Sequence, residues 1–140
     1  MMRTVVGTLG ILVGFGTIAW SAFPIFATFI SWAELGHPGL MSWLAWALAF
    51  DILTIIQGIV GIVAGRLILR RSTAAVTASV SVAGFALVSV IPGYFFWQGT
   101  NANGWLFLYL VLAPAILIGV VYTAIGEFAR KDLAGRPRRQ

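Results

Sequence analysis

Four long runs of apolar residues, separated by short polar segments, make up most of the chain. The runs cover residues 4–31, 41–69, 74–97 and 105–128, to within a few positions. Each is longer than the roughly 20 residues that a helix needs to cross about 30 Å of hydrocarbon. The pattern therefore predicts an all-α fold in which four transmembrane helices form a bundle.

The polar segments between the runs are rich in turn-forming residues. They lie at 32–39, 70–73 and 98–104. The middle segment is so short that the helices on either side of it are expected to form an antiparallel hairpin. We therefore predict one antiparallel four-helix transmembrane domain over residues 1–140, in which 129–140 form a basic tail.

The composition of the chain favours lipid as its solvent. Of the 140 residues, 60% are hydrophobic and 9% are charged. A soluble domain of this size leaves a large fraction of its surface in water, so it has nowhere to bury such an excess of apolar side chains. The chain also contains no cysteine, which excludes disulfide bonds and thiolate metal sites.

All nine lysine and arginine residues fall on one side of the predicted bundle. One precedes the first helix, a second group flanks the connection between the second and third helices, and the rest follow the fourth. They are Arg3, Arg66, Arg70, Arg71, Arg130, Lys131, Arg136, Arg138 and Arg139. Because positive charges resist translocation, we predict that both termini are cytoplasmic and that the membrane is a plasma (inner) membrane.

The basic residues other than Arg3 are also candidates for contacts with anionic lipid headgroups or a cytoplasmic partner. Each basic residue near a membrane surface contributes about 1 kcal/mol to such binding. Since the net charge of +5 sits at helix ends, no nucleic-acid partner is expected. Glu127 lies three residues before Arg130 and four residues before Lys131, and either spacing favours an ion pair on a helix.

Aromatic residues gather near the opposite ends of the runs. They are Trp32, Trp43, Trp46, Tyr94, Phe95, Phe96, Trp97 and Trp105. This distribution predicts an interfacial aromatic belt on the non-cytoplasmic side. A lipid or quinone site beneath the belt is the alternative interpretation.

Small residues recur at helical spacing in all four runs, as in helices that pack closely within lipid. The predicted packing residues are Gly7, Gly10, Gly14 and Thr17 in the first run, Gly58 and Gly65 in the second, Thr77, Ser81 and Gly84 in the third, and Gly119 in the fourth. Spacing alone does not divide these faces between contacts within the chain and contacts with other proteins.

Prolines interrupt the apolar runs. Pro24, Pro92 and Pro114 lie within or near them. A proline removes one backbone hydrogen bond and can bend a helix. Pro114 lies close to the middle of the fourth run, so the irregularity is expected to matter most there.

Three polar residues of the second run are candidates for an intramembrane site or a partner contact: Asp51, Thr54 and Gln57. A carboxylate near the bilayer centre costs at least about 2.5 kcal/mol unless it is paired, hydrated or protonated. Asp51 is therefore interpreted in three ways: as a proton or cation site, as a hydrogen-bonding partner of Thr17, Ser89 or another helix, or as a partner of a separate subunit. Gln57 is expected to form a hydrogen bond across helices.

No catalytic constellation is visible in the sequence. His37 is the single histidine, so a bis-histidine haem site within this chain is excluded. Neither a phosphate-binding glycine loop nor a Ser-His-Asp set is present. We therefore expect no enzyme activity, no cofactor and no metal. The segment from Ile56 to Arg66 is similar to the second helix of many bacterial four-helix membrane proteins, a resemblance too generic to imply a function.

Three hypotheses for function remain. The first is a non-catalytic accessory or stabilising subunit of a larger bacterial-type membrane complex, whose partners are other membrane subunits. The second is a small homo-oligomeric transporter or channel, coupled to ions or protons, that uses Asp51. The third is a lipid- or quinone-binding membrane module. The lack of an active site, together with the several small-residue faces, favours the first.

Overall fold

The computed structural model describes residues 1–35, 40–99 and 104–135, and within them the side chains of 23–24, 27–35, 40–44, 99 and 105–106 lie outside the description. The described part is helical throughout and contains no strand. The elements are α1 (Met2–Leu35), α2 (Leu40–Leu69), α3 (Ala74–Gly99), α4 (Gly104–Phe107), the π-helical segment η1 (Leu108–Leu112) and α5 (Ala113–Ala134).

Four segments are long and apolar enough to cross a membrane. They are Met2–Ala22, Ala45–Leu69, Ala74–Gln98 and Leu108–Ala134. This finding confirms the predicted all-α fold with four apolar spans. The last helix continues past the expected end at 128, so part of the segment expected to be a tail is helical. Lys131 lies in its last turn, where a positive charge is favourable beside the partial negative charge of the helix end.

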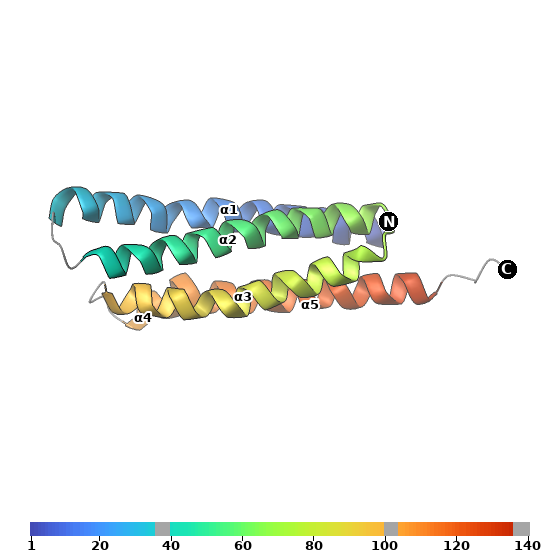
Figure 1. The fold of residues 1–140 in the computed structure, drawn as a ribbon. Coiled ribbons are helices and arrows are strands. Elements are labelled where there is room, and N and C mark those ends of the chain that lie inside the picture. The colour runs from blue at the N-terminus through green and yellow to red at the C-terminus, as the bar shows by residue number, and fades with distance from the viewer. Residues whose placement is uncertain (36–39, 100–103, 136–140) are drawn as a thin grey trace.

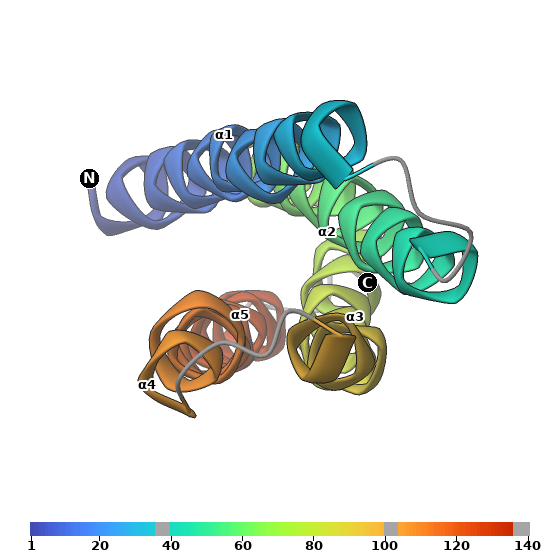
Figure 2. The same cartoon turned by 90° about the vertical axis from the view of Figure 1, so that its left-hand side faces the viewer.

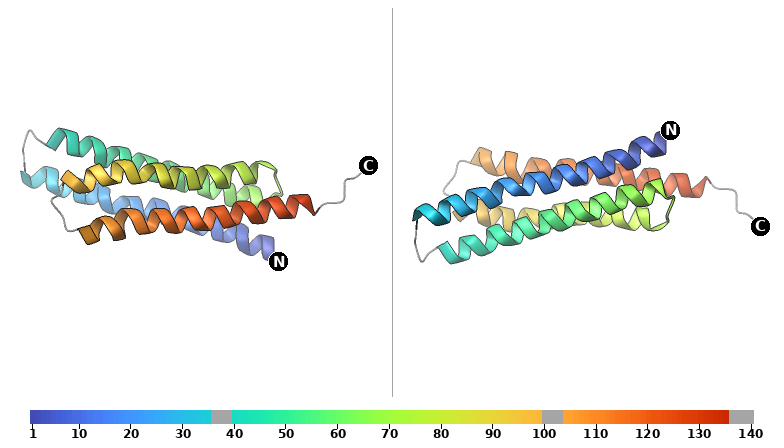
Figure 3. Two further views of the ribbon diagram at one scale, coloured as in Figure 1. Left: turned by 90° about the horizontal axis from the view of Figure 1, so that it is seen from below. Right: turned by 90° about the horizontal axis from the view of Figure 1, so that it is seen from above.

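The long helices lie side by side along one axis (Figure 1). The N-terminus, the connection between α2 and α3, and the end of α5 lie at one end, which we call the basic end because Arg66, Arg70, Arg71, Arg130 and Lys131 lie near it. The last residues of α1 and α3 and the first residues of α2 and α4 lie at the other end. The two views of Figure 3 show α3 and α5 in front on one side, and α1 and α2 in front on the other. The bundle is thus two layers of two helices.

The helices do not all pack against one another. Extensive contacts join α1 to α2, α2 to α3 and α3 to α5, whereas α1 and α5 touch at few positions. Figure 2, a view along the axis, shows the same succession, with α1 and α5 at its two ends. The side of the bundle between α1 and α5 is therefore the least tightly packed.

Buried apolar side chains from α2, α3 and α5 form a core in the half of the bundle nearest the basic end. The core consists of Ala64, Ile68, Ala75, Val82, Tyr122, Ile125 and Ala129. Alanines make up a large share of this core, which allows the helix backbones to approach closely. The opposite half of the bundle has no equivalent cluster among the described residues.

The connection between α2 and α3 is a tight turn closed by backbone hydrogen bonds. Arg71 adopts a left-handed conformation with φ of 56°, as is common just past the end of a helix. The N–H of Ser72 then donates to the carbonyl oxygen of Leu67 at 3.0 Å. The Ser72 hydroxyl oxygen accepts from the N–H of Ala74 at 3.3 Å, which satisfies one of the free donors at the start of α3.

The irregularity expected near Pro114 takes the form of the π-helical segment η1, directly before α5. Because Pro114 has no N–H, the α-helical hydrogen bond to the carbonyl of Leu110, four residues earlier, cannot form. The indole Nε1 of Trp20 in α1 donates to that carbonyl oxygen at 3.3 Å. A side chain of another helix thus occupies the acceptor that the proline leaves open.

Candidate functional site

Two pairs of glycines hold α1 against α2 at backbone distance. A Cβ atom added to Gly14 would lie 2.7 Å from the carbonyl oxygen of Gly58, and one added to Gly58 would lie 2.8 Å from that of Gly14. A Cβ atom on Gly65 would lie 2.5 Å from the carbonyl oxygen of Gly7. These contacts leave no room for any side chain, so the small residues of α1 and α2 pack against each other within the chain.

The spacing of these pairs predicts which residue of α1 lies opposite Asp51. Gly7 contacts Gly65, and one heptad further on Gly14 contacts Gly58. If this register continues for another seven residues in each helix, Ser21 is expected to lie opposite Asp51. Both side chains are buried, with 2% and 3% of their surfaces exposed.

Asp51 is therefore enclosed by its own chain. Neither of its carboxylate oxygens has a hydrogen-bond partner among the described residues. The hydroxyl of Ser21 donates to the carbonyl oxygen of Ile18 in its own helix, at 2.6 Å. Because the Asp51 oxygens do not reach the surface, a contact with a separate subunit would require the helices that bury Asp51 to move apart.

Tyr122 connects α5 to this pair of helices. Its hydroxyl donates to the carbonyl oxygen of Gly10 at 2.6 Å, and its side chain is 0% exposed. The ring lies over Gly61, where an added Cβ atom would collide with the phenol group. Sequence reasoning missed this contact, and the one signal available to it was a tyrosine within the fourth apolar run.

A cleft of about 430 Å³ opens where α1 and α5 fail to close the bundle. Most of the side chains that line it are apolar or aromatic, among them Val13, Trp20, Phe50, Tyr109, Pro114 and Leu117. Four polar residues also line it: Thr17, Thr54, Gln57 and Ser89. Of the predicted intramembrane site, the structure thus brings Thr54 and Gln57 together with Thr17, while Asp51 does not line the cleft.

The hydroxyl groups of Thr17, Thr54 and Ser89 form hydrogen bonds with carbonyl groups of their own helices. Thr17 donates to the carbonyl oxygen of Val13 at 2.8 Å and Thr54 to that of Phe50 at 2.7 Å. Ser89 donates to that of Ala86 at 2.8 Å. Their hydrogens are therefore not available to a ligand, and these groups offer acceptor lone pairs alone.

Gln57 differs from the hydroxyl residues of the cleft. Its side chain is 3% exposed and lines the cleft. The described residues give its amide no hydrogen-bond partner, so the expected bond across helices is not seen. Its amide atoms are not among the fully buried atoms without a partner, so the amide is open to the cleft and is free to form hydrogen bonds there.

The predicted packing residues of the third and fourth runs face away from the other helices. Thr77 and Gly84 are exposed, and Cβ atoms added to Gly84 or Gly119 would meet nothing within 4 Å. Ser81 donates to the carbonyl oxygen of Thr77 in its own helix at 2.8 Å. The bundle instead buries a different face of α3, with Ala75, Ser79, Val82, Ala86 and Ser89.

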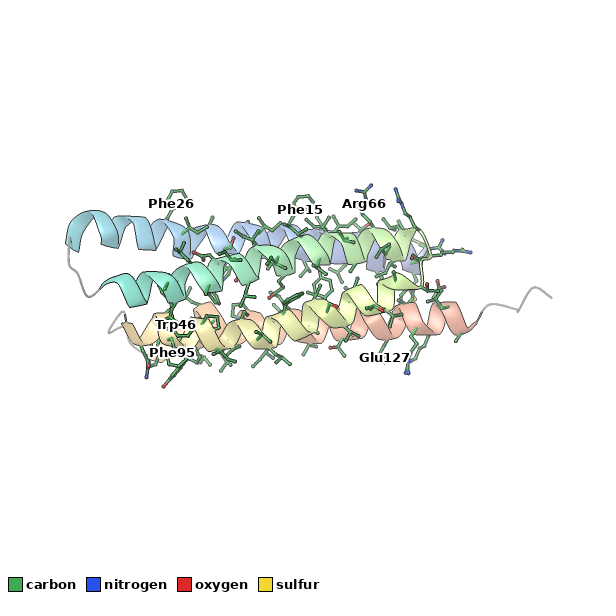
Figure 4. The ribbon with its side chains drawn as sticks, viewed as in Figure 1. Phe15, Phe26, Trp46, Arg66, Phe95 and Glu127 are labelled. Carbon is green, nitrogen blue, oxygen red and sulfur yellow. The ribbon has the colours of Figure 1, made fainter. Side chains whose placement is uncertain are left out.

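The basic residues are exposed at the basic end. Arg66, Arg70, Arg71, Arg130 and Lys131 all lie at the surface, and Figure 4 shows Arg66 and Glu127 on opposite layers of the bundle. Arg130 donates to Glu127 at 2.7 Å, so the ion pair predicted for Glu127 forms with Arg130. Arg136, Arg138 and Arg139 lie outside the described residues.

Aromatic rings cluster at the end of the bundle opposite the basic end. Trp46 of α2 stacks on Phe95 of α3 with ring centroids 4.6 Å apart, and both are labelled in Figure 4. Tyr94 and Trp97 contact Phe107 with centroids 5.6 Å and 5.4 Å away. The side chains of Trp32, Trp43 and Trp105 lie outside the description. Phe15 and Phe26 of α1, by contrast, project away from the other helices.

Comparisons with protein-family models, curated proteins and solved structures find no match to this chain. Its function must therefore be argued from the arrangement of its own residues.

Proposed function

We propose that the protein is a non-catalytic accessory subunit that stabilises a larger membrane complex through the outer face of α3. The observation that supports the proposal is the division of the small-residue faces. The small-residue faces of α1 and α2 pack against each other within the chain. On α3, by contrast, Thr77 and Gly84 are exposed.

The chemistry of the α3 face fits a transmembrane helix of another subunit. In lipid, helices associate by close backbone contact and by hydrogen bonds between hydroxyl groups rather than by hydrophobic exclusion. Gly84 lets a second backbone approach, and the hydroxyls of Thr77 and Ser81 retain free acceptor lone pairs. Gly119 of α5, also without neighbours within 4 Å, offers a second point of close approach.

The decisive experiment is affinity purification from native membranes in mild detergent with the variant Gly84→Leu. A Cβ atom added at this position meets nothing within 4 Å, so the start of the new side chain has room. We expect a membrane protein that co-purifies with the wild type to be lost from this variant. Gly16→Leu, equally free of neighbours but on α1, is the matched control and should retain the partner. A purely homomeric species, or equal recovery with Gly84→Leu, contradicts the proposal.

We further propose that the bundle lies in a plasma (inner) membrane with a defined orientation. We propose an antiparallel bundle with both termini on the cytoplasmic side, where the basic end also contacts anionic headgroups. The distribution of arginines supports it, since positive residues are retained on the side of synthesis. Labelling a C-terminal cysteine tag in intact cells is the test. Protection from an impermeant reagent is expected, and labelling from outside contradicts the orientation.

The burial of Asp51 favours a second candidate, an ion- or proton-coupled transporter or channel. A carboxyl group without a partner inside an apolar span is a default functional hypothesis. The measurement is proton- or cation-driven flux in liposomes for the wild type and Asp51→Asn. Flux that disappears in the variant supports this candidate, and no flux in the wild type removes it.

A further inference from the structure

The cleft beside α1 has the size and lining of a small-molecule site. Its volume of about 430 Å³ falls within the roughly 300–1,000 Å³ typical of such sites, which are mostly apolar with a few polar groups that fix orientation. Gln57 supplies that polar group. Its amide offers two donors and one acceptor, and the described residues leave them unpaired.

The depth of Gln57 restricts the chemistry of the ligand. Gln57 lies midway along the span Ala45–Leu69, so at about 1.5 Å per residue each end of the span is roughly 18 Å away. The ester carbonyls of phospholipids lie at the boundary of the hydrocarbon core, roughly 15 Å from its centre. A phospholipid can therefore fill the cleft with methylene groups but brings no acceptor to Gln57.

The aromatic lining adds a requirement for a flat group. Trp20, Phe50 and Tyr109 all line the cleft, and aromatic side chains stack well against a planar ring. A neutral ring that carries a carbonyl and a hydrocarbon tail meets both requirements. Its carbonyl accepts from the Gln57 amide, its ring contacts the aromatic side chains, and its tail leaves through the side of the bundle where α1 and α5 make few contacts.

We propose that this cleft binds the ring of an isoprenoid quinone, with a ring carbonyl hydrogen-bonded to Gln57. The inference concerns binding alone, and it does not rest on the accessory-subunit proposal. The cleft opens beside α1 and α5, whereas the small-residue face lies on the outer side of α3.

The test uses the full chain in phospholipid nanodiscs, with decylubiquinone as the probe and native mass spectrometry as the readout. We expect one quinone per chain, with saturable binding. Gln57→Leu keeps the approximate volume but removes the amide, and it should weaken binding about tenfold, the equivalent of one hydrogen bond. Gly16 lines the cleft, and a Cβ atom added to it meets nothing within 4 Å. The side chain in Gly16→Leu therefore extends into the space that the quinone ring would fill, and it should abolish binding.

Gly84→Leu is the matched control, since it adds the same side chain to a glycine outside the cleft and should leave quinone binding unchanged. Retention of a phospholipid alone, lost in Gly16→Leu, would overturn the assignment to a quinone. So would quinone binding that Gly16→Leu leaves intact. Failure of the α3 face to hold a partner has no bearing on these results, so the two proposals fail separately.

Discussion

Tyr122 of α5 donates its hydroxyl hydrogen to the carbonyl oxygen of Gly10 in α1, with 2.6 Å between the two oxygens. The two residues lie on helices that otherwise make few contacts. The ring reaches Gly10 by passing over Gly61 of α2. One side chain thus joins three helices near the core and limits how far α1 and α5 separate beside the cleft.

Tyr122→Phe is expected to destabilise the bundle, because it removes this hydrogen bond and leaves the ring in place. Hydrogen bonds between membrane helices average about 0.6 kcal/mol and reach about 1.7 kcal/mol. Unfolding in mixed micelles with increasing dodecyl sulfate measures the change. Gly61→Ala supplies a cross-check, since its methyl group collides with the Tyr122 phenol. The two substitutions should be strongly non-additive, and simple additivity contradicts the contact.

Gly14 and Gly58 should respond to alanine in the opposite sense to Gly84 and Gly119. Gly14→Ala or Gly58→Ala forces a methyl group to within 2.7–2.8 Å of a facing backbone oxygen, and overpacking of this kind costs roughly 1–3 kcal/mol. Gly84→Ala and Gly119→Ala meet nothing within 4 Å. They should be neutral or stabilising by up to about 1 kcal/mol through helix propensity. Equal losses in both groups would contradict the assignment of faces.

The hydrogen bond between Trp20 and Leu110 should depend on Pro114. In Pro114→Ala the restored N–H can bond to the Leu110 carbonyl within its own helix, so Trp20 loses its role there. We expect Trp20→Phe to cost about 0.6 kcal/mol in the wild type and less in the Pro114→Ala background. The measurement is the same unfolding titration on the two single variants and the double variant. An equal cost in both backgrounds would show that the indole bond is independent of the proline.

The sequence predicted the four apolar helices and the close faces of α1 and α2, because glycines such as Gly14 and Gly58 recur at heptad spacing. It did not locate the buried faces of α3 and α5. Helical periodicity shows that Thr77 and Gly84 share a face, but only the position of neighbouring helices decides whether that face lies inside. The sequence also did not predict the cleft. Gln57, Trp20 and Pro114 line it together, but they are distant in sequence, and only the packing of the helices brings them to one site.

The pairing of Ser21 with Asp51 can be tested directly because the chain contains no cysteine. If the heptad register of Gly7–Gly65 and Gly14–Gly58 continues, Ser21→Cys and Asp51→Cys together should form a disulfide under mild oxidation, since their Cα atoms then lie within the roughly 7 Å that such a bond permits. The matched control is Ser21→Cys with Ile52→Cys, because Ile52 is adjacent to Asp51 in sequence but is exposed. Protease cleavage in the loop between α1 and α2, followed by non-reducing electrophoresis, separates the two outcomes. Cross-linking of the control pair but not of the first pair would mean that α2 is rotated and that Asp51 faces elsewhere.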